Sequence, residues 1–439
     1  MKEVEFSTQK SDVRKVDLMG NSKANFWSIS IFSSSSQNFF QQFFSAFARL
    51  AGVSATVLGF VMSVRNLLTG LFQGVVGRLS DKLGRKFILI AGFIIGVIIP
   101  IPLIFFENTY LLIVVAVIQA FSVSVVTPTW NAVLGDVTEP ENRAAFIGKI
   151  TSIGRIVSVT FTLLVALVFF FVEFYSGWVI LGWFVYLSWR VQYSVAFGIS
   201  AFNSLLCIIS MLFFKETRIV DPKNNHVPKM RIAFQDKNFV KFLIVNSIWG
   251  ITMAMIWPTN PIILVDHLKL DFWQVAIMTS AFTVFTAFAQ ILGGRLSDKI
   301  GKRKPLILIS IFVLLFFPVS MVPAITADSW PLLIISRFVG GLGTGINLVA
   351  VSAYTLDLAP NDLMGGYSGL REVFYGIATF IGSFISGFII DAFLVNYSIK
   401  TTVIIMSIGV TVLRVIAAIG FLFISESMPK NASEKAIAK

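Results

Sequence analysis

One short charged phrase occurs twice in this chain, and the two copies lie half the chain apart. The first copy begins at Gly77 and reads GRLSDKLGRK, and the second begins at Gly294 and reads GRLSDKIGKR. Matching polar positions continue on both sides at nearly the same offset: Ser63 and Ser280, Gln73 and Gln290, Asp136 and Asp357. One such match means little, but the ordered series indicates an internal duplication. Each half of the chain is therefore expected to fold in the same way.

The chain is too apolar to cover itself with a polar surface. Of its 439 residues, 56% are hydrophobic and 13% are charged, whereas soluble domains carry about 25% charged residues. In lipid every backbone group must be paired within the chain, which leaves helices or closed barrels. The apolar segments run for about 20 residues, the length of a membrane-crossing helix, and lack the alternation of barrel strands. The sequence therefore predicts an all-α polytopic membrane protein.

Twelve spans are predicted, six in each half. They lie near 26–49, 54–77, 86–106, 109–134, 143–172 and 190–214, and then near 239–264, 272–294, 305–326, 330–356, 366–391 and 400–424. Two bundles accordingly cover 26–214 and 239–424, with a linker over 215–238 and tails over 1–25 and 425–439. The aromatic stretch 172–189 is expected at the outer membrane interface, where Trp and Tyr are favoured, with a re-entrant helix as the alternative.

The positive charges indicate the orientation. The net charge is +12, and Lys and Arg concentrate in the N-terminal tail, the repeated turns and the linker. The positive-inside rule then predicts that both termini and the linker are cytoplasmic. Because this rule explains the basic residues, we expect no nucleic acid partner.

Few residues suit catalysis or metal binding. Cys207 is the only cysteine, and His226 and His267 are the only histidines. The sequence contains no nucleophile–base pair, no His/Cys cluster and no phosphate-binding glycine loop ahead of a lysine. We therefore expect no enzyme activity, no metal and no cofactor, although a polytopic enzyme and a receptor that binds without transport stay as alternatives.

The repeated turn resembles the signature loop between spans 2 and 3 of the major facilitator superfamily, G-x-L-x-D-R/K-x-G-R-K/R. The resemblance extends over nearly the whole chain and includes Trp189-Arg190, which opens span 6, and Asp357-Leu358-Ala359-Pro360, which ends span 10. It implies two six-helix bundles related by a pseudo-two-fold axis, with a substrate cavity between them. It also implies a secondary transporter that works by alternating access.

The resemblance implies a cytoplasmic gate at the repeated turn. Asp81 and Asp298 are each expected to face a helix N-terminus of the other bundle, which carries partial positive charge; the alternative is that the turn charges only anchor the loops. Basic residues of the turns are expected to pair with the inner ends of spans 4 and 10, forming contacts that break when this side opens. The gate set is Gly77, Asp81, Arg85 with Asp136, Arg143, Gly294, Asp298, and Lys302 with Asp357. On the outer side, Trp257–Pro261 is expected to break span 7 and form an outer gate.

Polar residues at helical spacing predict the cavity. Span 1 carries a polar face that is expected to line the cavity, with interhelical hydrogen bonding as the alternative. The duplication places Arg155 and Glu372 on matching faces of spans 5 and 11, and ionisable residues at membrane depth are functional candidates. For the arginines the alternative is a structural pair, and for Glu372 an ion pair with an arginine. Substrate contacts are assigned to Asn38, Gln41, Arg65, Gln119, Asn131, Arg155, Asn246, Trp249 and Tyr375, and proton coupling to Glu372.

The cavity candidates contain more cations than anions. Arg65 and Arg155 stand against Glu372, and arginine suits carboxylate and phosphate, which favours a small organic anion as substrate. The aromatic content and the uncharged span 1 favour the alternative, export of a neutral, sugar-like or drug-like compound. The expected partners are the lipid bilayer, a small-molecule substrate and protons, and the expected form is a monomer in the plasma membrane.

Overall fold

The computed structural model describes residues 20–137, 140–174, 188–217, 232–300, 302–360 and 364–427. Within these ranges the ordered elements are all helices. Eleven of them are long and apolar enough to cross a membrane, and α1, with 28 residues, supplies the twelfth span. The predicted all-α fold is confirmed. Most of the aromatic stretch 172–189 lies outside the described residues.

The first half contains six spans in seven helices. They are α1 (Lys23–Leu50), α2 (Ala55–Leu83), α3 (Arg85–Ile98) with α4 (Ile101–Phe105), α5 (Thr109–Asp136), α6 (Pro140–Phe174) and α7 (Trp189–Leu212). Ser and Asn caps begin α1, α2 and α5, where a side chain of Ser22, Ser54 or Asn108 accepts from a backbone N–H of the first turn.

The second half repeats the order with more interruptions. Its spans are α8 (Lys237–Ala254) with α9 (Thr259–Pro261) and the π-helical η2 (Ile262–His267), α10 (Phe272–Ile300), α11 (Lys304–Val319) with α12 (Val322–Thr326), η3 (Trp330–Leu332) with α13 (Leu333–Leu358), α14 (Met364–Asn396), and α15 (Ile399–Ile419) with η4 (Gly420–Phe423). Pro258 and Pro261 stand at the break after α8, as the sequence predicts, because a proline cannot donate to the preceding turn.

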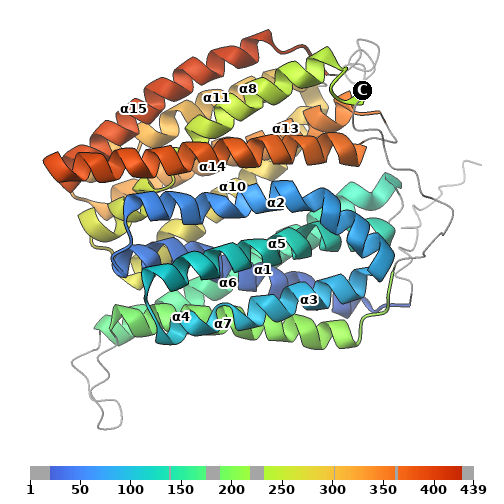
Figure 1. Cartoon of the computed structure of the whole chain (residues 1–439), viewed down its shortest axis with the longest axis horizontal. Coiled ribbons are helices and arrows are strands. Elements are labelled where there is room, and N and C mark those ends of the chain that lie inside the picture. The colour runs from blue at the N-terminus through green and yellow to red at the C-terminus, as the bar shows by residue number, and fades with distance from the viewer. Residues whose placement is uncertain are drawn as a thin grey trace, which may run out of the picture.

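The helices run side by side and define two ends of the molecule (Figure 1). We call the linker end the one where α2, α7 and α10 end and α8 begins; it carries both copies of the repeated turn. We call the far end the opposite one, where α1 passes into α2 and η2 into α10. Every span therefore runs from one end to the other, so the position of a residue along its span tells how far it lies from each end.

The two halves meet along α2 and α14, which lie side by side across the middle of the molecule (Figure 1). Glycines let the two backbones touch. A Cβ added at Gly59 would lie 2.3 Å from the carbonyl oxygen of Ser383, and one at Gly387 would lie 2.3 Å from that of Ala55. Further along the seam, a Cβ at Gly70 would lie 2.5 Å from a carbonyl oxygen of α14. Small residues permit such close helix packing in membranes.

The buried core differs between the two ends. At the far end one continuous cluster contains residues of both halves, among them Phe43, Phe197, Ile263 and Val403. Toward the linker end, the described residues form separate clusters, two within the first half and one within the second. Among the described residues, the buried clusters thus join the halves at the far end and stay within one half toward the linker end.

Candidate functional site

A polar cavity lies between the halves, with a volume of about 600 Å³. We call it the polar chamber. Most of its lining comes from α1, α2, α5 and α6 of the first half, and the second half contributes Leu348 and Glu372. Hydroxyl and amide groups dominate, including Ser34, Gln37 and Asn38 of α1. The second half therefore forms one wall of a site that is built chiefly by the first.

A second cavity of about 410 Å³ lies nearer the far end. We call it the aromatic chamber, because Phe40, Phe44, Trp257 and Phe282 line it. Two of these rings belong to each half, so both halves are needed to enclose it. Four residues line both chambers, at the point where they adjoin: Gln41, Arg65, Asn66 and Val123.

The ionisable groups of the cavity differ in their partners. Arg155 donates to Oε1 of Gln290 at 2.7 Å, across the halves. Glu372 forms an ion pair with its neighbour Arg371. Arg65 has no hydrogen-bond or ion-pair partner among the described residues, and it lines both chambers. The unpaired Arg65 together with Arg155, which faces a neutral amide, gives the cavity an excess of positive charge.

Two other deep arginines are structural. Arg414 donates to the backbone carbonyl groups of Met253 at 3.1 Å and Leu314 at 2.8 Å. Arg337 donates to Oδ1 of Asn260 at 2.7 Å. Both therefore bind chain segments of their own half, in contrast to Arg65.

Most of the predicted substrate contacts come together in the chambers. Asn38, Gln41, Arg65, Asn131 and Arg155 line the polar chamber, and Gln119 lines the aromatic one. Glu372, the predicted proton-coupling residue, also lines the polar chamber. The sequence-based assignment missed Asn66, although this residue follows Arg65 directly in a polar stretch of span 2. It also missed the role of Gln290, which the duplication had marked as the counterpart of Gln73.

Three predicted contacts lie elsewhere. The assignment of Trp249 is wrong, because its side chain is 1% exposed and packs in the core of the second half beside Phe421. Asn246 is buried on the same helix, and Tyr375 packs against Gly250. None of the three lines the two chambers. Spacing along one span does not tell which face of the helix meets the cavity.

Span 1 uses its polar residues on two faces. Ser36 lies 2.7 Å from the Ser204 hydroxyl, which links α1 to α7. Asn38 donates to Ser158 of α6 at 2.7 Å while it lines the polar chamber. Both expected roles, cavity lining and interhelical hydrogen bonding, thus occur on α1.

At the linker end each half contains an ion pair of the repeated turn. Arg85 Nε lies 3.1 Å from Asp136, as expected. In the second half the residue that pairs with Asp357 is Arg303, at 2.9 Å, and the prediction of Lys302 is wrong. In the second copy α11 begins only at Lys304, with Arg303 as its N-cap, so the arginine that forms the pair lies one position later than the repeat predicts. Lys302 is exposed. Both pairs join residues of one half, and the expectation that they break when this end opens stays a prediction.

Beside each of these ion pairs a glutamate binds the N-terminus of the helix that follows the turn. Glu216 accepts hydrogen bonds from the first two backbone N–H groups of α3, both at 3.0 Å. Glu426 accepts from the N–H groups of Arg303 and Lys304 at 2.8 and 3.1 Å. Carboxylates are favoured at helix N-termini because of the unpaired N–H groups there. The sequence signal was the pair of matching span ends, Lys215-Glu216 and Ser425-Glu426.

The remaining gate residues are less fully described. The side chains of Asp81, Arg143 and Asp298, and the surroundings of Gly77, lie outside the described part of the structure. A Cβ added at Gly294 would meet nothing within 4 Å. The expected contacts of the two aspartates with the opposite bundle therefore stay predictions.

Two carboxylates of the second half contact the first half at the far end. The Asp391 carboxylate of α14 accepts from the backbone N–H groups of Ala55 and Thr56, both at 2.8 Å, and from the Thr56 hydroxyl at 2.6 Å. It thus caps the N-terminus of α2. Arg49, at the end of α1, forms an ion pair with Asp266 of η2 at 2.5 Å. Sequence reasoning missed both contacts.

An aromatic cluster closes the far end between these contacts. Phe272, the first residue of α10, stacks on Phe43 with ring centroids 4.4 Å apart. Phe169 and Tyr193 meet the same ring edge-on, at 4.9 and 5.2 Å. One ring of the second half is therefore enclosed by three rings of the first.

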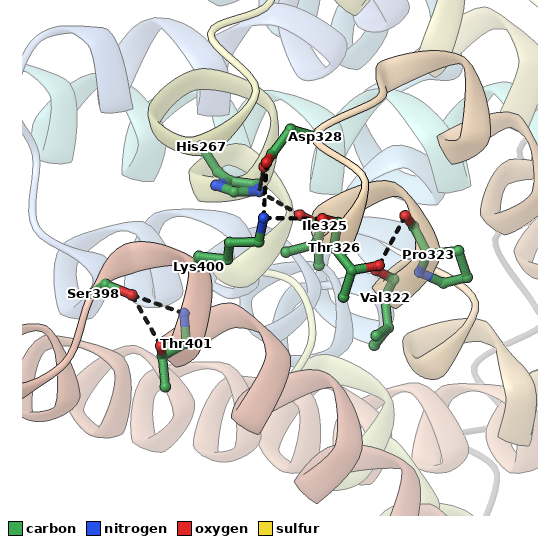
Figure 2. Close-up of polar contacts among 9 residues, drawn as sticks. All are labelled: His267, Val322, Pro323, Ile325, Thr326, Asp328, Ser398, Lys400 and Thr401. Atoms are coloured by element: carbon green, nitrogen blue, oxygen red, sulfur yellow. Dashed lines mark hydrogen bonds and ion pairs between the residues drawn. The ribbon is translucent and has the colours of Figure 1, made fainter.

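Polar contacts among His267, Asp328 and Lys400, here called the brace, support η2 within the second half (Figure 2). Asp328 accepts from Lys400 at 2.8 Å and lies 3.1 Å from Nε2 of His267. The same Nε2 lies 3.0 Å from the carbonyl oxygen of Ile325, so it carries the proton. Lys400 lowers the pKa of Asp328, first by its hydrogen bond and then by its charge. Because His267 follows Asp266, the brace holds the partner of Arg49.

These features define a helical membrane protein of two bundles with a central polar cavity, closed at one end. A sequence profile described as Major Facilitator Superfamily matches residues 26–255 and 242–439. The chain belongs to this superfamily, whose members are transporters rather than enzymes.

Similar proteins agree with this assignment. The chain is 30% identical over 117 residues to "Putative polyol transporter 2" of Arabidopsis thaliana, over 27% of this chain and 22% of that protein. It is 32% identical over 100 residues to "Major myo-inositol transporter IolT" of Bacillus subtilis, over 23% of this chain and 20% of that protein. The chain thus matches only about a fifth of the length of these relatives.

Solved structures share the fold. The nucleoside transporter NupG superposes with a TM-score of 0.70 at 14% identity, over 91% of this chain and 99% of that chain. A bacterial homologue of the human lysosomal transporter Spinster, in an inward-facing and unoccupied conformation, gives 0.67 at 17% identity, over 94% and 97%. At these identities the likeness shows the twelve-helix fold alone.

Proposed function

We propose that the protein is a secondary active transporter that moves a small organic anion across the plasma membrane by alternating access, as a monomer. Membership of the superfamily supports transport of a small organic solute. The anionic character of the substrate is supported by the cavity itself, and Arg65 is the observation that carries it.

Arg65 suits an anion because its guanidinium has no partner of its own. An arginine inside a membrane protein normally pairs with an acid or with backbone carbonyls, as Arg414 does here. Among the described residues Arg65 has neither, and it lines the junction of both chambers. A carboxylate or phosphate of the substrate satisfies it bidentately. Arg155 provides a second positive charge in the same chamber.

The alternating-access cycle follows from the difference between the two ends. With the linker end cytoplasmic, as the positive-inside rule predicts, the structure corresponds to a state closed on the outside. The substrate binds from the cytoplasmic side or leaves to it, and the far-end contacts of Asp391, Arg49 and Phe272 then break in the outward-open state. A ligand shifts such an equilibrium by its differential affinity for the two states.

Proton coupling is assigned to Glu372. It is the one acidic residue that lines the polar chamber among the described residues, and Arg371 holds it there. A proton on Glu372 releases Arg371 from its partner, which links protonation to the charge of the cavity. Glu372→Gln is expected to abolish the dependence of uptake on an imposed pH gradient while leaving substrate exchange in place.

A second candidate substrate is a neutral polyol or sugar. The amide and hydroxyl lining of the polar chamber supports it, with Gln37, Asn38, Asn66 and Asn131 all present. Two relatives are named for polyol and myo-inositol transport. For such a substrate Arg65 donates hydrogen bonds to uncharged hydroxyl groups, so replacing Arg65 reduces substrate binding less than it does for an anion.

The test is uptake into liposomes that contain the purified full-length chain. Uptake of labelled organic anions and of labelled myo-inositol is compared in wild type, Arg65→Gln and the control Phe312→Ala. Phe312 is a suitable control because it is 63% exposed on the surface of the molecule and does not line the chambers. We expect anion uptake to fall about tenfold or more in Arg65→Gln, since hydrogen bonds to charged groups are worth about 1.5–3 kcal/mol. Uptake of myo-inositol alone, or anion uptake unchanged in Arg65→Gln, contradicts the proposal.

A further inference from the structure

The cavity has two parts of different chemistry that adjoin at a single cation. The polar chamber offers amides and hydroxyls, and the aromatic chamber offers the rings of Phe40, Phe44, Trp257 and Phe282. Arg65 lines both. A small hydrophilic anion uses only the first of these parts.

Resting on the proposed function, we propose that the transported anion is an aromatic carboxylate with a hydroxyl group on its ring. Its carboxylate binds Arg65 at the junction, and its ring lies in the aromatic chamber. The ring hydroxyl donates a hydrogen bond to Gln119.

The size of the aromatic chamber fits this ligand. A dry cavity of about 150 Å³ holds a benzene molecule, and the chamber has about 410 Å³. It therefore has room for a substituted ring. Aromatic rings pack offset or edge-to-face with other rings, at centroid separations of about 4.5–7 Å. With four rings in its wall the chamber offers several such contacts.

Gln119 of α5 is a polar residue in the lining of the aromatic chamber. Its side chain is 5% exposed, and its Oε1 atom is buried with no hydrogen-bond partner among the described residues. A buried acceptor without a donor is costly, and the residue that carries it lines the chamber. A ligand hydroxyl directed away from the carboxylate provides the missing donor. Gln119 thus favours a hydroxylated ring over a plain one.

The same lining disfavours a polyol in the aromatic chamber. A polyol carries a hydroxyl on each carbon, and against Phe40, Phe44 and Phe282 most of these groups lose their water without gaining a partner. Beyond the junction residues Gln41, Arg65 and Asn66, the lining offers only Gln119, Ser45 and the indole N–H of Trp257 as partners. A polyol is therefore confined to the polar chamber and leaves the rings unused.

The aromatic chamber also connects binding to the transport cycle. Phe40 and Phe44 belong to α1, whereas Trp257 and Phe282 belong to the second half. The chamber is complete only while the far end is closed. A ring bound in it stabilises the closed far end, and opening that end separates the rings and releases the ligand.

The test is equilibrium binding to the full-length protein in lipid nanodiscs. The probes are 4-hydroxybenzoate, benzoate, the uncharged 4-hydroxybenzyl alcohol, acetate and myo-inositol. We expect 4-hydroxybenzoate to bind about tenfold or more tightly than acetate or the alcohol, a difference of about 1.4 kcal/mol or more, and more tightly than benzoate.

Three variants assign the contacts. Gln119→Leu is expected to abolish the preference for 4-hydroxybenzoate over benzoate while benzoate still binds. Phe282→Ala is expected to weaken both aromatic ligands and leave acetate unchanged, and Phe312→Ala to change none. If acetate binds as tightly as 4-hydroxybenzoate and both depend on Arg65, the aromatic inference fails and anion transport stands. If only myo-inositol binds, the aromatic inference and the proposal of anion transport both fail.

Discussion

Asp391 joins the two halves through one carboxylate. It accepts two backbone N–H groups and one hydroxyl at the N-terminus of α2, although it belongs to α14 of the other half. A helix cap of this kind contributes about 0.5–2 kcal/mol, and the charge adds to it through the helix dipole. Since the bond crosses the far end, it stabilises the closed state relative to the open one.

Asp391→Asn keeps one acceptor oxygen and removes the charge. We expect it to raise the population with an open far end about fivefold or more, because a loss of 1 kcal/mol or more changes a two-state ratio by about that factor. The accessibility of a cysteine introduced at Thr279, beside Gln42 of the other half, reports the change. Asp236→Asn is the control, since Asp236 caps the N-terminus of α8 at the linker end and contacts its own half; an equal rise in both variants contradicts the assignment.

Asp328 gives the far end a pH dependence of its own. The Lys400 hydrogen bond lowers the pKa of Asp328 in the folded state, so its contribution to stability is present above the ordinary aspartate pKa of about 3.9. That contribution is lost as the pH falls through the lowered folded value. We expect the difference in unfolding temperature between wild type and Asp328→Asn to shrink from about pH 5 to about pH 3. A difference that does not vary with pH contradicts this reading.

At the scale of helices, the seam between α2 and α14 depends on the absence of side chains. A Cβ at Gly387 would lie 2.3 Å from a backbone carbonyl oxygen of α2, and neither backbone can yield without moving its helix. We expect Gly387→Ala to cost about 1–3 kcal/mol, as overpacking does, and to favour the open far end. Gly409→Ala is the matched control: its added Cβ meets nothing within 4 Å, so it is expected to be neutral or stabilising. Unfolding in detergent measures both, and equal effects contradict the packing argument.

In each half, the contacts of the repeated turn join the helix after the turn to the ends of two other spans, as α3 is joined to the ends of α5 and α7. The arginine in these contacts is Arg85 in the first half and Arg303 in the second, and each pairs with an aspartate at the end of another helix. We expect Arg303→Ala to lower the free energy of unfolding by about 1–2 kcal/mol, since the pair is partly exposed. Lys302→Ala is expected to change it by about 0.5 kcal/mol or less. A larger effect of Lys302→Ala restores the pairing that the sequence predicted.

At this scale the sequence predicts more than it does for single residues. The twelve spans, the break at Pro258 and the duplication follow from apolar runs, proline chemistry and a repeated phrase. Lys302 was predicted in place of Arg303 because the residue at which α11 begins cannot be known from the repeated phrase. Asp391 and Asp266 were missed because a lone acidic residue near a helix end does not reveal a partner on the other half of the chain.

For the whole molecule, the difference between the ends is the main result. One core joins both halves at the far end, and the described residues of the linker end form a core in each half. The polar and aromatic chambers lie between these ends. Which face of α8 meets the cavity depends on how the halves pack, and Trp249, predicted as a contact but buried in the core, illustrates that spacing within one helix cannot supply this. The unpaired state of Arg65 likewise depends on the neighbours that the fold brings to it.

The central claim is that the two ends open in alternation. Spin labels at Tyr110 and Val395 report the far end, and labels at Phe213 and Phe423 report the linker end; all four side chains are exposed. Cys207 is buried and is replaced by alanine. The account predicts that substrate or a change of pH populates a second state in which the linker-end distance shortens while the far-end distance lengthens. Distances that stay fixed at both ends, or that change in the same direction, contradict it.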